Sequence, residues 1–442
     1  MTEMNGEDEV DEIYGNVDEE PQRSRPIFTG EQLDIEAYAS LYSGRTKIVR
    51  LIFIANHCNN AAMEIEALKM AHDEIKTGED TKLYRDVVQK IDGRLGPDYA
   101  LDSDWADTID KKAELRQKKL ETDLSGYRLN LIKESIRMGY NDFGDFYYAH
   151  GKLEDAFKNY IRARDYCTTS KHHLHMCTSA ILVSIEMSQF IHVPSYVGKA
   201  EQIMVAEGFD YITASKMHVA SALALLEAKK YKHAARKFLE TGLELENNYT
   251  EVIVSRDVAT YGGLCALATF DRTELKTKVL DNSTFQILLE LVPEVRELIH
   301  NFYYSRYASA LDYLANLKTN MLLDIHLHDH VDTLYEKIRH KALIQYTHPF
   351  VSVDLHMMAS AFRTTVEGLQ KELEALITNN QIQARIDSHN KVLYARHADQ
   401  RNATFHGVLQ TGREFDRDVK AMLLRSNFLK QNELNIADRR RM

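Results

Sequence analysis

Residues 132–163, IKESIRMGYNDFGDFYYAHGKLEDAFKNYIRA, carry the pattern that decides the fold. Small and aromatic side chains recur along this stretch at helical spacing: Tyr140, Gly144, Tyr147, Ala156, Tyr160 and Ala163. A small residue in one helix lets the next helix pack closely, and aromatic rings fill the wedge between neighbouring helices. Gly151 separates the two sets and is typical of a helix end. The stretch therefore predicts two antiparallel helices joined by a tight turn.

This helical pair recurs further along the chain. The turn Gly151-Lys152-Leu153 has counterparts in Ser188-Gln189-Phe190 and Lys229-Lys230-Tyr231, after intervals of 37 and then 41 residues. Ala234 and Phe238 match Ala156 and Tyr160. The spacing is close to that of tetratricopeptide repeats, although its period drifts near 40 residues. We therefore expect a degenerate helical-hairpin solenoid over residues 31–255, a scaffold whose concave surface binds other proteins.

The composition favours helices throughout. The 442 residues include only 6 Pro and 19 Gly, so helix breakers and tight turns are few. The four cysteines are scattered and no signal peptide precedes them, which predicts reduced thiols in a soluble protein of the nucleus and cytoplasm. The densest apolar stretch, Ile48–Cys58, contains Arg50 and is too short to span a bilayer. We expect no membrane partner.

The net charge of −11 is concentrated at one end. The first twenty residues carry nine acids and no base, which leaves 57 acids against 55 bases in the rest of the chain. We interpret residues 1–30 as a disordered acidic tail on a near-neutral body. Such a tail would act through basic surfaces, and added salt would weaken its effect.

Beyond Pro349 the pattern changes to helix, helix and hairpin, which predicts a winged helix over residues 349–397. Ser352 is expected to cap the first helix and Thr365 the second. The hairpin is predicted from alternation at Ile382, Ala384 and Ile386. Its turn falls at 388–390, and residues 391–395 form the returning strand. A final helix is predicted over 402–428, within a C-terminal segment of 401–430, followed by a flexible end at 431–442.

Two surfaces of this C-terminal half are candidate partner interfaces. A small sheet with a free edge can accept a strand or wing of another chain. The long helix would expose apolar side chains, and such a surface usually binds another protein. The candidate interface residues are Ile382, Ala384, Ile386, Val392, Tyr394, Met422, Leu423 and Phe428.

Several patterns suggest chemistry but lack its requirements. His326, His328 and His330 alternate, yet side chains two residues apart on a helix diverge by about 200°, so they could not share one metal ion. Cys167, the histidines that follow it and Cys177 match no zinc signature. Gly139 and Gly144 have the spacing of a phosphate loop, but Asp145 stands where lysine is required. We expect no catalytic site, no metal and no cofactor.

The winged helix raises the possibility of nucleic-acid binding. The helix expected to face a groove carries Glu367, Glu372 and Glu374 against a single Lys371. Phosphates would repel that surface. We therefore expect a protein–protein module and no nucleic-acid partner.

A solenoid followed by a winged helix and a long C-terminal helix is the layout of the PCI family. This family supplies scaffold subunits to the signalosome, the proteasome lid and translation initiation factor three. Residues 256–276 and 350–395 resemble the start and end of a PCI domain, here placed at 256–400. The stretches YSGRTKIVRLIFIANHC (42–58), LLDIHLHDHVDTLYEKIR (322–339) and RIDSHNKVLYARHADQRNATF (385–405) resemble the signalosome branch in its plant form.

The resemblance implies an all-α, non-catalytic scaffold in a complex that removes a ubiquitin-like modifier from cullins. In plants, that activity represses light-triggered development in darkness. Other signalosome subunits would bind the winged helix and the C-terminal helix, and cullin–RING ligases or other proteins would bind the solenoid. The alternative is a scaffold subunit of the proteasome lid, which shares this architecture.

Overall fold

The computed structural model describes residues 34–207, 210–245, 248–396 and 400–439, so the predicted disordered tail lies outside the described residues. These residues are almost entirely helical. They divide into two compact units. The first reaches Tyr304 and resumes over Ser309–Lys337, and the second combines Ser305–Ala308 with the chain from Ile338 onward.

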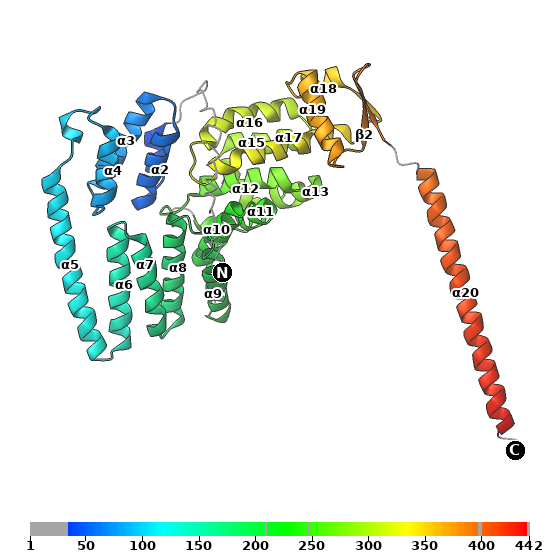
Figure 1. Ribbon diagram of the computed structural model, residues 1–442, viewed down its shortest axis with the longest axis horizontal. Coiled ribbons are helices and arrows are strands. Elements are labelled where there is room, and N and C mark those ends of the chain that lie inside the picture. Colours follow the sequence, from blue (N-terminus) through cyan, green and yellow to red (C-terminus); the bar gives the residue numbers. More distant parts are fainter. Residues whose placement is uncertain (1–33, 208–209, 246–247, 397–399, 440–442) are drawn as a thin grey trace, which may run out of the picture. The chain divides into compact units, whose positions relative to one another are not determined.

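The first unit begins with short helices and continues as a row of antiparallel helices (Figure 1). Its first helices are α1 (Ile35–Ser40), α2 (Gly44–His57), α3 (Ala61–Ile75), α4 (Thr81–Ile91), η1 (Pro97–Tyr99) and α5 (Ser103–Leu129). The repeat region contains α6 (Lys133–Ala149), α7 (Leu153–Ala163), η2 (Arg164–Tyr166), α8 (Ser170–Glu186), α9 (Val193–Glu207), α10 (Tyr211–Glu227), α11 (Tyr231–Leu239) and η3 (Leu243–Leu245).

The chain then continues through further helices toward the winged helix. These are α12 (Ser255–Thr269), α13 (Arg272–Leu275), the π-helical turn η4 (Lys276–Leu280), α14 (Ser283–Glu290), α15 (Pro293–Tyr303), α16 (Tyr307–Met321), η5 (His328–His330) and α17 (Val331–Thr347). Helices α16 and α17 each have residues in both units. The predicted helical-repeat fold class is therefore confirmed.

The three repeat turns share one backbone geometry. Gly151, Ser188 and Lys229 each lie two residues after a helix ends and have φ of 71°, 56° and 57°. In all three turns the amide of the next residue donates to the carbonyl oxygen five residues earlier, at 2.9 Å. This left-handed ending satisfies carbonyl groups that the helix leaves unpaired. The predicted repeat is confirmed at these turns, although only the first uses glycine.

Close packing within the first pair depends on Gly144. A Cβ atom on Gly144 would lie 2.4–2.7 Å from the ring of Tyr160, so only glycine allows α6 and α7 this separation. The Tyr160 hydroxyl donates to Asp145 Oδ1 at 2.5 Å, which fixes the ring. Gly139 and Gly144 are both buried in α6, so neither belongs to a phosphate-binding loop.

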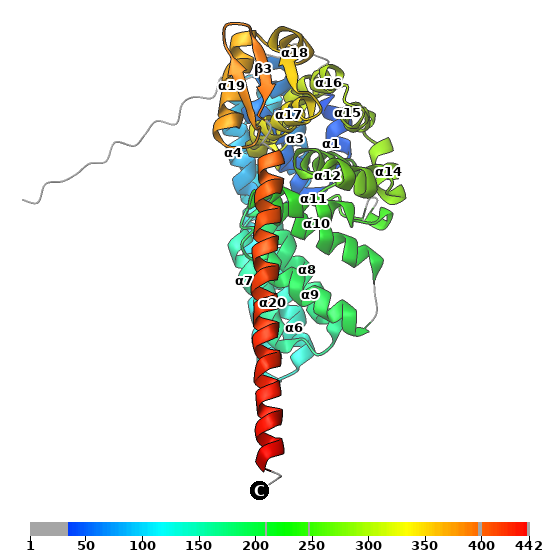
Figure 2. The same ribbon diagram turned by 90° about the vertical axis from the view of Figure 1, so that its right-hand side faces the viewer.

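The second unit holds the predicted winged helix. It contains β1 (Ser352–Asp354), α18 (Leu355–Ala361), α19 (Val366–Thr378), β2 (Ala384–Asp387) and β3 (Val392–Ala395). The strands form an antiparallel sheet in the order β1-β3-β2, and Figure 2 shows it beside α18 and α19. The predicted hairpin is confirmed as β2 and β3.

One predicted cap of the winged helix is correct and the other is wrong. Thr365 caps α19, because its Oγ1 accepts from the amide of Gly368 at 3.2 Å. Asp354 caps α18 by accepting from the amide of His356 at 2.7 Å, whereas Ser352 lies in β1 opposite Tyr394. Both side chains can cap a helix, and a strand of three residues is too short to show alternation.

The C-terminal helix α20 (Gln400–Arg439) is longer than the predicted 402–428 (Figure 2). Its described side chains, from Thr404 to Lys430, are almost all exposed. Among the described residues no helix is long and apolar enough to cross a membrane.

Candidate functional site

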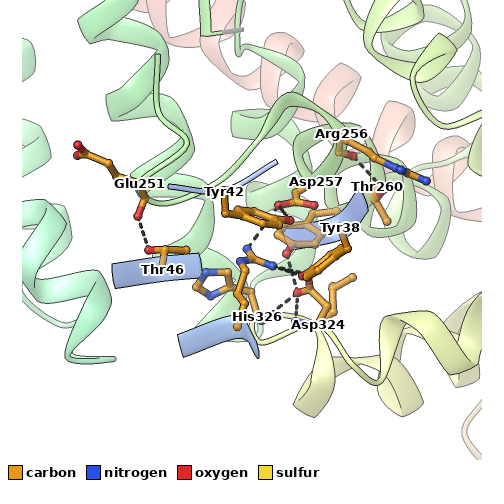
Figure 3. A network of polar contacts seen from close by, with 12 residues as sticks. Tyr38, Tyr42, Thr46, Glu251, Arg256, Asp257, Thr260, Asp324 and His326 are labelled. Carbon is orange, nitrogen blue, oxygen red and sulfur yellow. Dashed lines mark hydrogen bonds and ion pairs between the residues drawn. The ribbon is translucent and has the colours of Figure 1, made fainter. Parts of the chain in front are cut away.

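An extensive polar site of the first unit includes Tyr38, Tyr42, Asp257 and Asp324 (Figure 3). These residues surround Arg50, a residue of α2 that is only 2% exposed. Its Nη1 donates to the Tyr38 hydroxyl at 2.7 Å and to Asp324 Oδ2 at 2.9 Å. Its Nη2 lies 3.4 Å from Asp257 Oδ2. One arginine therefore joins α1, α2, α12 and the turn after α16.

Aromatic hydroxyl groups complete this site. The Tyr42 hydroxyl donates to Asp257 Oδ2 at 2.7 Å, and the Tyr261 hydroxyl donates to Asp324 Oδ1 at 2.6 Å. The guanidinium carbon of Arg50 also lies 4.1 Å from the centre of the Tyr42 ring, a cation–π contact. We call Arg50, Asp257, Asp324 and the three tyrosines the arginine hub.

The charges of the arginine hub do not cancel, because one guanidinium faces two carboxylates. Burial raises the pKa of Asp257 to about 6, against the opposing effect of Arg50. Burial also acts to raise the pKa of Asp324, but Arg50, His326 and the hydrogen bond from Tyr261 together outweigh burial, and the pKa falls below its ordinary value. Burial lowers the pKa of the neighbouring His326 to about 4, and Arg50 adds to that effect.

The arginine hub connects residues that are far apart in sequence. Asp257 follows Arg50 by 207 residues and Asp324 follows it by 274. A second contact reinforces the connection, since the Ser43 and Thr250 hydroxyls lie 2.8 Å apart and the Thr46 hydroxyl donates to the Glu251 carbonyl. The site therefore fixes the N-terminal helices on α12, a structural role suited to a scaffold.

A second buried cluster lies where α2, α6 and α8 meet. Arg45 Nη1 pairs with Asp80 Oδ2 at 2.5 Å, while Arg45 Nε lies 3.5 Å from Glu186 Oε2. The Tyr148 hydroxyl donates to the other oxygen of Glu186. Burial raises the pKa of Glu186 to about 7, although Tyr148 and Arg45 both act to lower it.

The alternating histidines point to separate neighbours. The segment is a turn followed by η5 and not the assumed α-helix. The His326 ring lies 6.4 Å from Tyr261, the His328 ring 4.5 Å from His57, and His330 Nδ1 3.2 Å from the Tyr231 hydroxyl. Among the described residues, no group of three or more His, Cys, Asp or Glu side chains is arranged to hold a metal ion.

The predicted interface residues of the winged helix differ in exposure. Ile382 and Ala384 are 7% and 6% exposed and form part of the unit's own core, while Ile386 and Val392 are half-buried. Tyr394 is 43% exposed and lies opposite Arg385 and Ser352 on the outer face of the sheet. Tyr394 is thus the most accessible of the five.

The predicted interface residues of α20 are far more exposed. Met422, Leu423 and Phe428 are 71%, 59% and 67% exposed. They belong to a longer series of apolar side chains: Phe405, Val408, Leu409, Phe415, Met422, Leu423, Leu424, Phe428 and Leu429. The two groups of candidates belong to separate parts of the chain, the winged helix and α20.

Sequence reasoning missed the arginine hub. Arg50 was visible as one charge inside the apolar run Ile48–Cys58, which signals a buried partner. Nothing in the sequence identifies Asp257 and Asp324 as those partners. On α19, Glu372 pairs with Arg339 Nε at 2.8 Å, so one acid of the helix considered for nucleic-acid binding is held by its own unit.

Family models match most of the described chain. Residues 102–278 match the 26S proteasome subunit RPN7 family, residues 312–397 match the PCI domain, and residues 400–426 match the family described as COP9 signalosome complex subunit 1, C-terminal helix. The PCI match confirms the predicted family. The last match covers the exposed helix α20.

Comparison with similar proteins distinguishes between the two alternatives, a signalosome subunit and a proteasome lid subunit. The chain is 68% identical to COP9 signalosome complex subunit 1 of Arabidopsis thaliana, over 95% of each chain. It is 40% identical to subunit 1b of Drosophila melanogaster, over 96% of this chain and 90% of the relative. Identity to the 26S proteasome non-ATPase regulatory subunit 6 of Caenorhabditis elegans is only 25%, over 67% of this chain and 74% of the relative. The chain belongs to the COP9 signalosome complex subunit 1 family.

Proposed function

We propose that this chain is a non-catalytic scaffold subunit of a signalosome that removes a ubiquitin-like modifier from cullins. Through that reaction the complex regulates cullin–RING ubiquitin ligases, and in plants it represses photomorphogenesis. The similarity to the Arabidopsis protein supports the plant form. The arginine hub supports a structural role, because its carboxylates and hydroxyl groups are used in joining helices.

The observation that carries the proposal is the exposed face of α20. Apolar side chains recur along this helix at spacings of three, four or seven residues: Phe405, Val408, Phe415, Val419, Met422 and Leu429. This spacing is that of a helix that packs against other helices. A soluble chain rarely exposes so many apolar side chains without a partner. We propose that other subunits of the complex cover this face.

The remaining surfaces provide further contacts. The outer face of the sheet, around Tyr394, and the free edge of β2 would bind a neighbouring winged helix. The solenoid would bind cullin–RING ligases or other proteins. We place this complex in the nucleus and the cytoplasm, which fractionation of cells expressing the tagged chain would test.

Affinity purification of the tagged chain, with mass spectrometry, tests the proposal. We expect the other signalosome subunits to co-purify. The double variant Phe415→Glu and Met422→Glu should reduce their recovery at least about tenfold, because two desolvated anchors at an interface contribute well over 1.4 kcal/mol.

Arg417→Glu serves as the matched control. Arg417 is exposed on the same helix, outside the apolar series, and it forms an ion pair with the adjacent Asp418. Normal recovery of the subunits with the double variant would contradict the role of α20. Recovery of proteasome lid subunits in place of signalosome subunits would favour the alternative function.

A further inference from the structure

A surface of the first unit holds more positive charge than its own acids neutralise. The Glu274 carboxylate forms ion pairs with three cations: Lys232 Nζ at 2.8 Å, Lys278 Nζ at 3.3 Å and Arg236 Nη2 at 3.4 Å. The hydrogen bond from Lys232, with help from Lys278, lowers the pKa of Glu274 to about 2. One carboxylate therefore gathers three positive charges at a single point.

The surrounding sequence adds further cations. Residues 229–239 carry five Lys or Arg and no acid, and residues 272–280 carry three with Glu274 as the only acid. Lys229, Lys230 and Lys276 are exposed. We call Lys229, Lys230, Lys232, Arg236, Lys276 and Lys278 the basic surface. It lies on α11, on the turn before it and on η4, and π-helical turns such as η4 are frequent at functional sites.

The opposite charge is carried by the same chain. Residues 1–20 hold nine acids and no base, while the rest of the chain is almost balanced. We propose that the basic surface binds this acidic N-terminal segment of its own chain. Glu274 pre-positions the three cations that the segment would contact, and it competes with the segment for them.

The distances allow this contact. Tyr42, close to the first described residue, hydrogen-bonds Asp257 of α12, and Tyr261 of α12 lies 5.9 Å from the Phe238 ring of α11. Phe238 is six residues, or about 9 Å, from Lys232 along α11. The thirteen residues between position 20 and Asp34 span about 20 Å on average and about 45 Å when extended.

Tethering favours the contact in cis. Attachment to the same chain gives the bound segment an effective concentration of about millimolar, so even a weak interaction is populated. The contact is electrostatic and will weaken as salt shortens the Debye length. An acidic segment of another protein would have to displace the N-terminal segment to reach the basic surface.

Zero-length carbodiimide crosslinking of the full-length chain, with mass spectrometry, tests the proposal. This reagent joins carboxylates to lysines only where they touch. We expect crosslinks between residues 3–20 and Lys232, Lys276 or Lys278, and we expect them to fall several-fold in 0.5 M salt. A mixture of isotopically light and heavy chains distinguishes contacts within one chain from contacts between two copies.

Two variants change the crosslink yield in opposite directions. Glu274→Gln removes the internal competitor but keeps its hydrogen-bonding shape, so crosslinks to Lys232 and Lys278 should rise. The double variant Arg236→Gln and Lys276→Gln leaves those two lysines as reporters and should lower the yield about fivefold at low salt. A gain of yield cannot arise from loss of folding.

The matched control is Lys111→Gln with Lys112→Gln, two exposed lysines of α5. This variant should leave the crosslinks of the basic surface unchanged. Crosslinks spread equally over the lysines of α5 and the basic surface would overturn the proposal. Crosslinks found only between light and heavy chains would do so as well, because the contact would then join two copies.

Discussion

At the scale of the residue, Arg50 is the cation that separates two buried carboxylates. The Arg50→Met variant would leave Asp257 and Asp324 facing each other without compensation. We expect the free energy of unfolding to fall by about 3–5 kcal/mol, the range for breaking a buried ion pair. Denaturant unfolding followed by circular dichroism measures the change.

The control for Arg50 is Arg85→Met. Arg85 forms an ion pair of 2.9 Å with Asp110, but both side chains are more than 40% exposed. Water screens such pairs, so this variant should lose at most about 1 kcal/mol. Equal losses from the two variants would show that the arginine hub adds nothing beyond an ordinary surface contact.

Glu186 makes stability depend on pH in the direction opposite to most carboxylates. Its pKa is about 7 in the folded chain and 4.5 without burial, so the folded state holds its proton more tightly. Its contribution is therefore most favourable below pH 4.5 and is lost as the pH rises through 7. We expect Glu186→Gln to be more stable than the parent at pH 8, by up to about 3 kcal/mol.

The comparison should be made at two pH values. Near pH 5 the side chain at position 186 is neutral in both folded chains, so their unfolding free energies should differ much less than at pH 8. Arg45, Asp80, Tyr148 and Glu251 face the same cluster and are identical in both chains, so their effects cancel. A difference that stays constant from pH 5 to pH 8 would rule out titration of Glu186.

At the scale of the element, the separation of α6 and α7 depends on Gly144. In Gly144→Ala the new methyl group would meet the ring of Tyr160, and the helices would have to move apart. We expect a loss of about 1–3 kcal/mol, as for other overpacked cores. Gly198→Ala in α9 is the control, because its Cβ atom meets nothing within 4 Å.

Thermal unfolding measures the stability change of each glycine variant, and we expect the two changes to differ in direction. Alanine favours a helix over glycine by up to about 1 kcal/mol, so Gly198→Ala should be neutral or stabilising. Destabilisation by Gly144→Ala alone would assign the effect to close packing. If both variants behaved alike, helix propensity and not the Tyr160 ring would explain the result.

The sequence predicted those elements whose signals are local. Helices α6 and α7 form the pair predicted within residues 132–163, Thr365 caps α19, and the hairpin follows its alternating residues. Strand β1 was missed because three residues cannot show a period, and Asp354 competed with Ser352 as a cap. The extension of α20 beyond residue 428 lacks any helix-ending glycine or proline that would mark its limit.

At the scale of the whole molecule, the sequence could not reveal which distant residues meet. Tyr394 and the apolar face of α20 were predictable, because each follows from periodicity within its own element. The arginine hub was not, because its carboxylates come from α12 and from a turn more than 200 residues after α2. Complementary charges in a sequence do not specify their pairing.

The span of the arginine hub also determines when the first unit can be completed during synthesis. Asp324 is added 274 residues after Arg50, which takes about 14–55 s at 5–20 residues per second. Throughout that interval the N-terminal helices lack the carboxylates that hold them. The N-terminal helices therefore leave the ribosome well before Asp324 is synthesised. Chaperones and proteases should have the greatest access to these helices in a nascent chain.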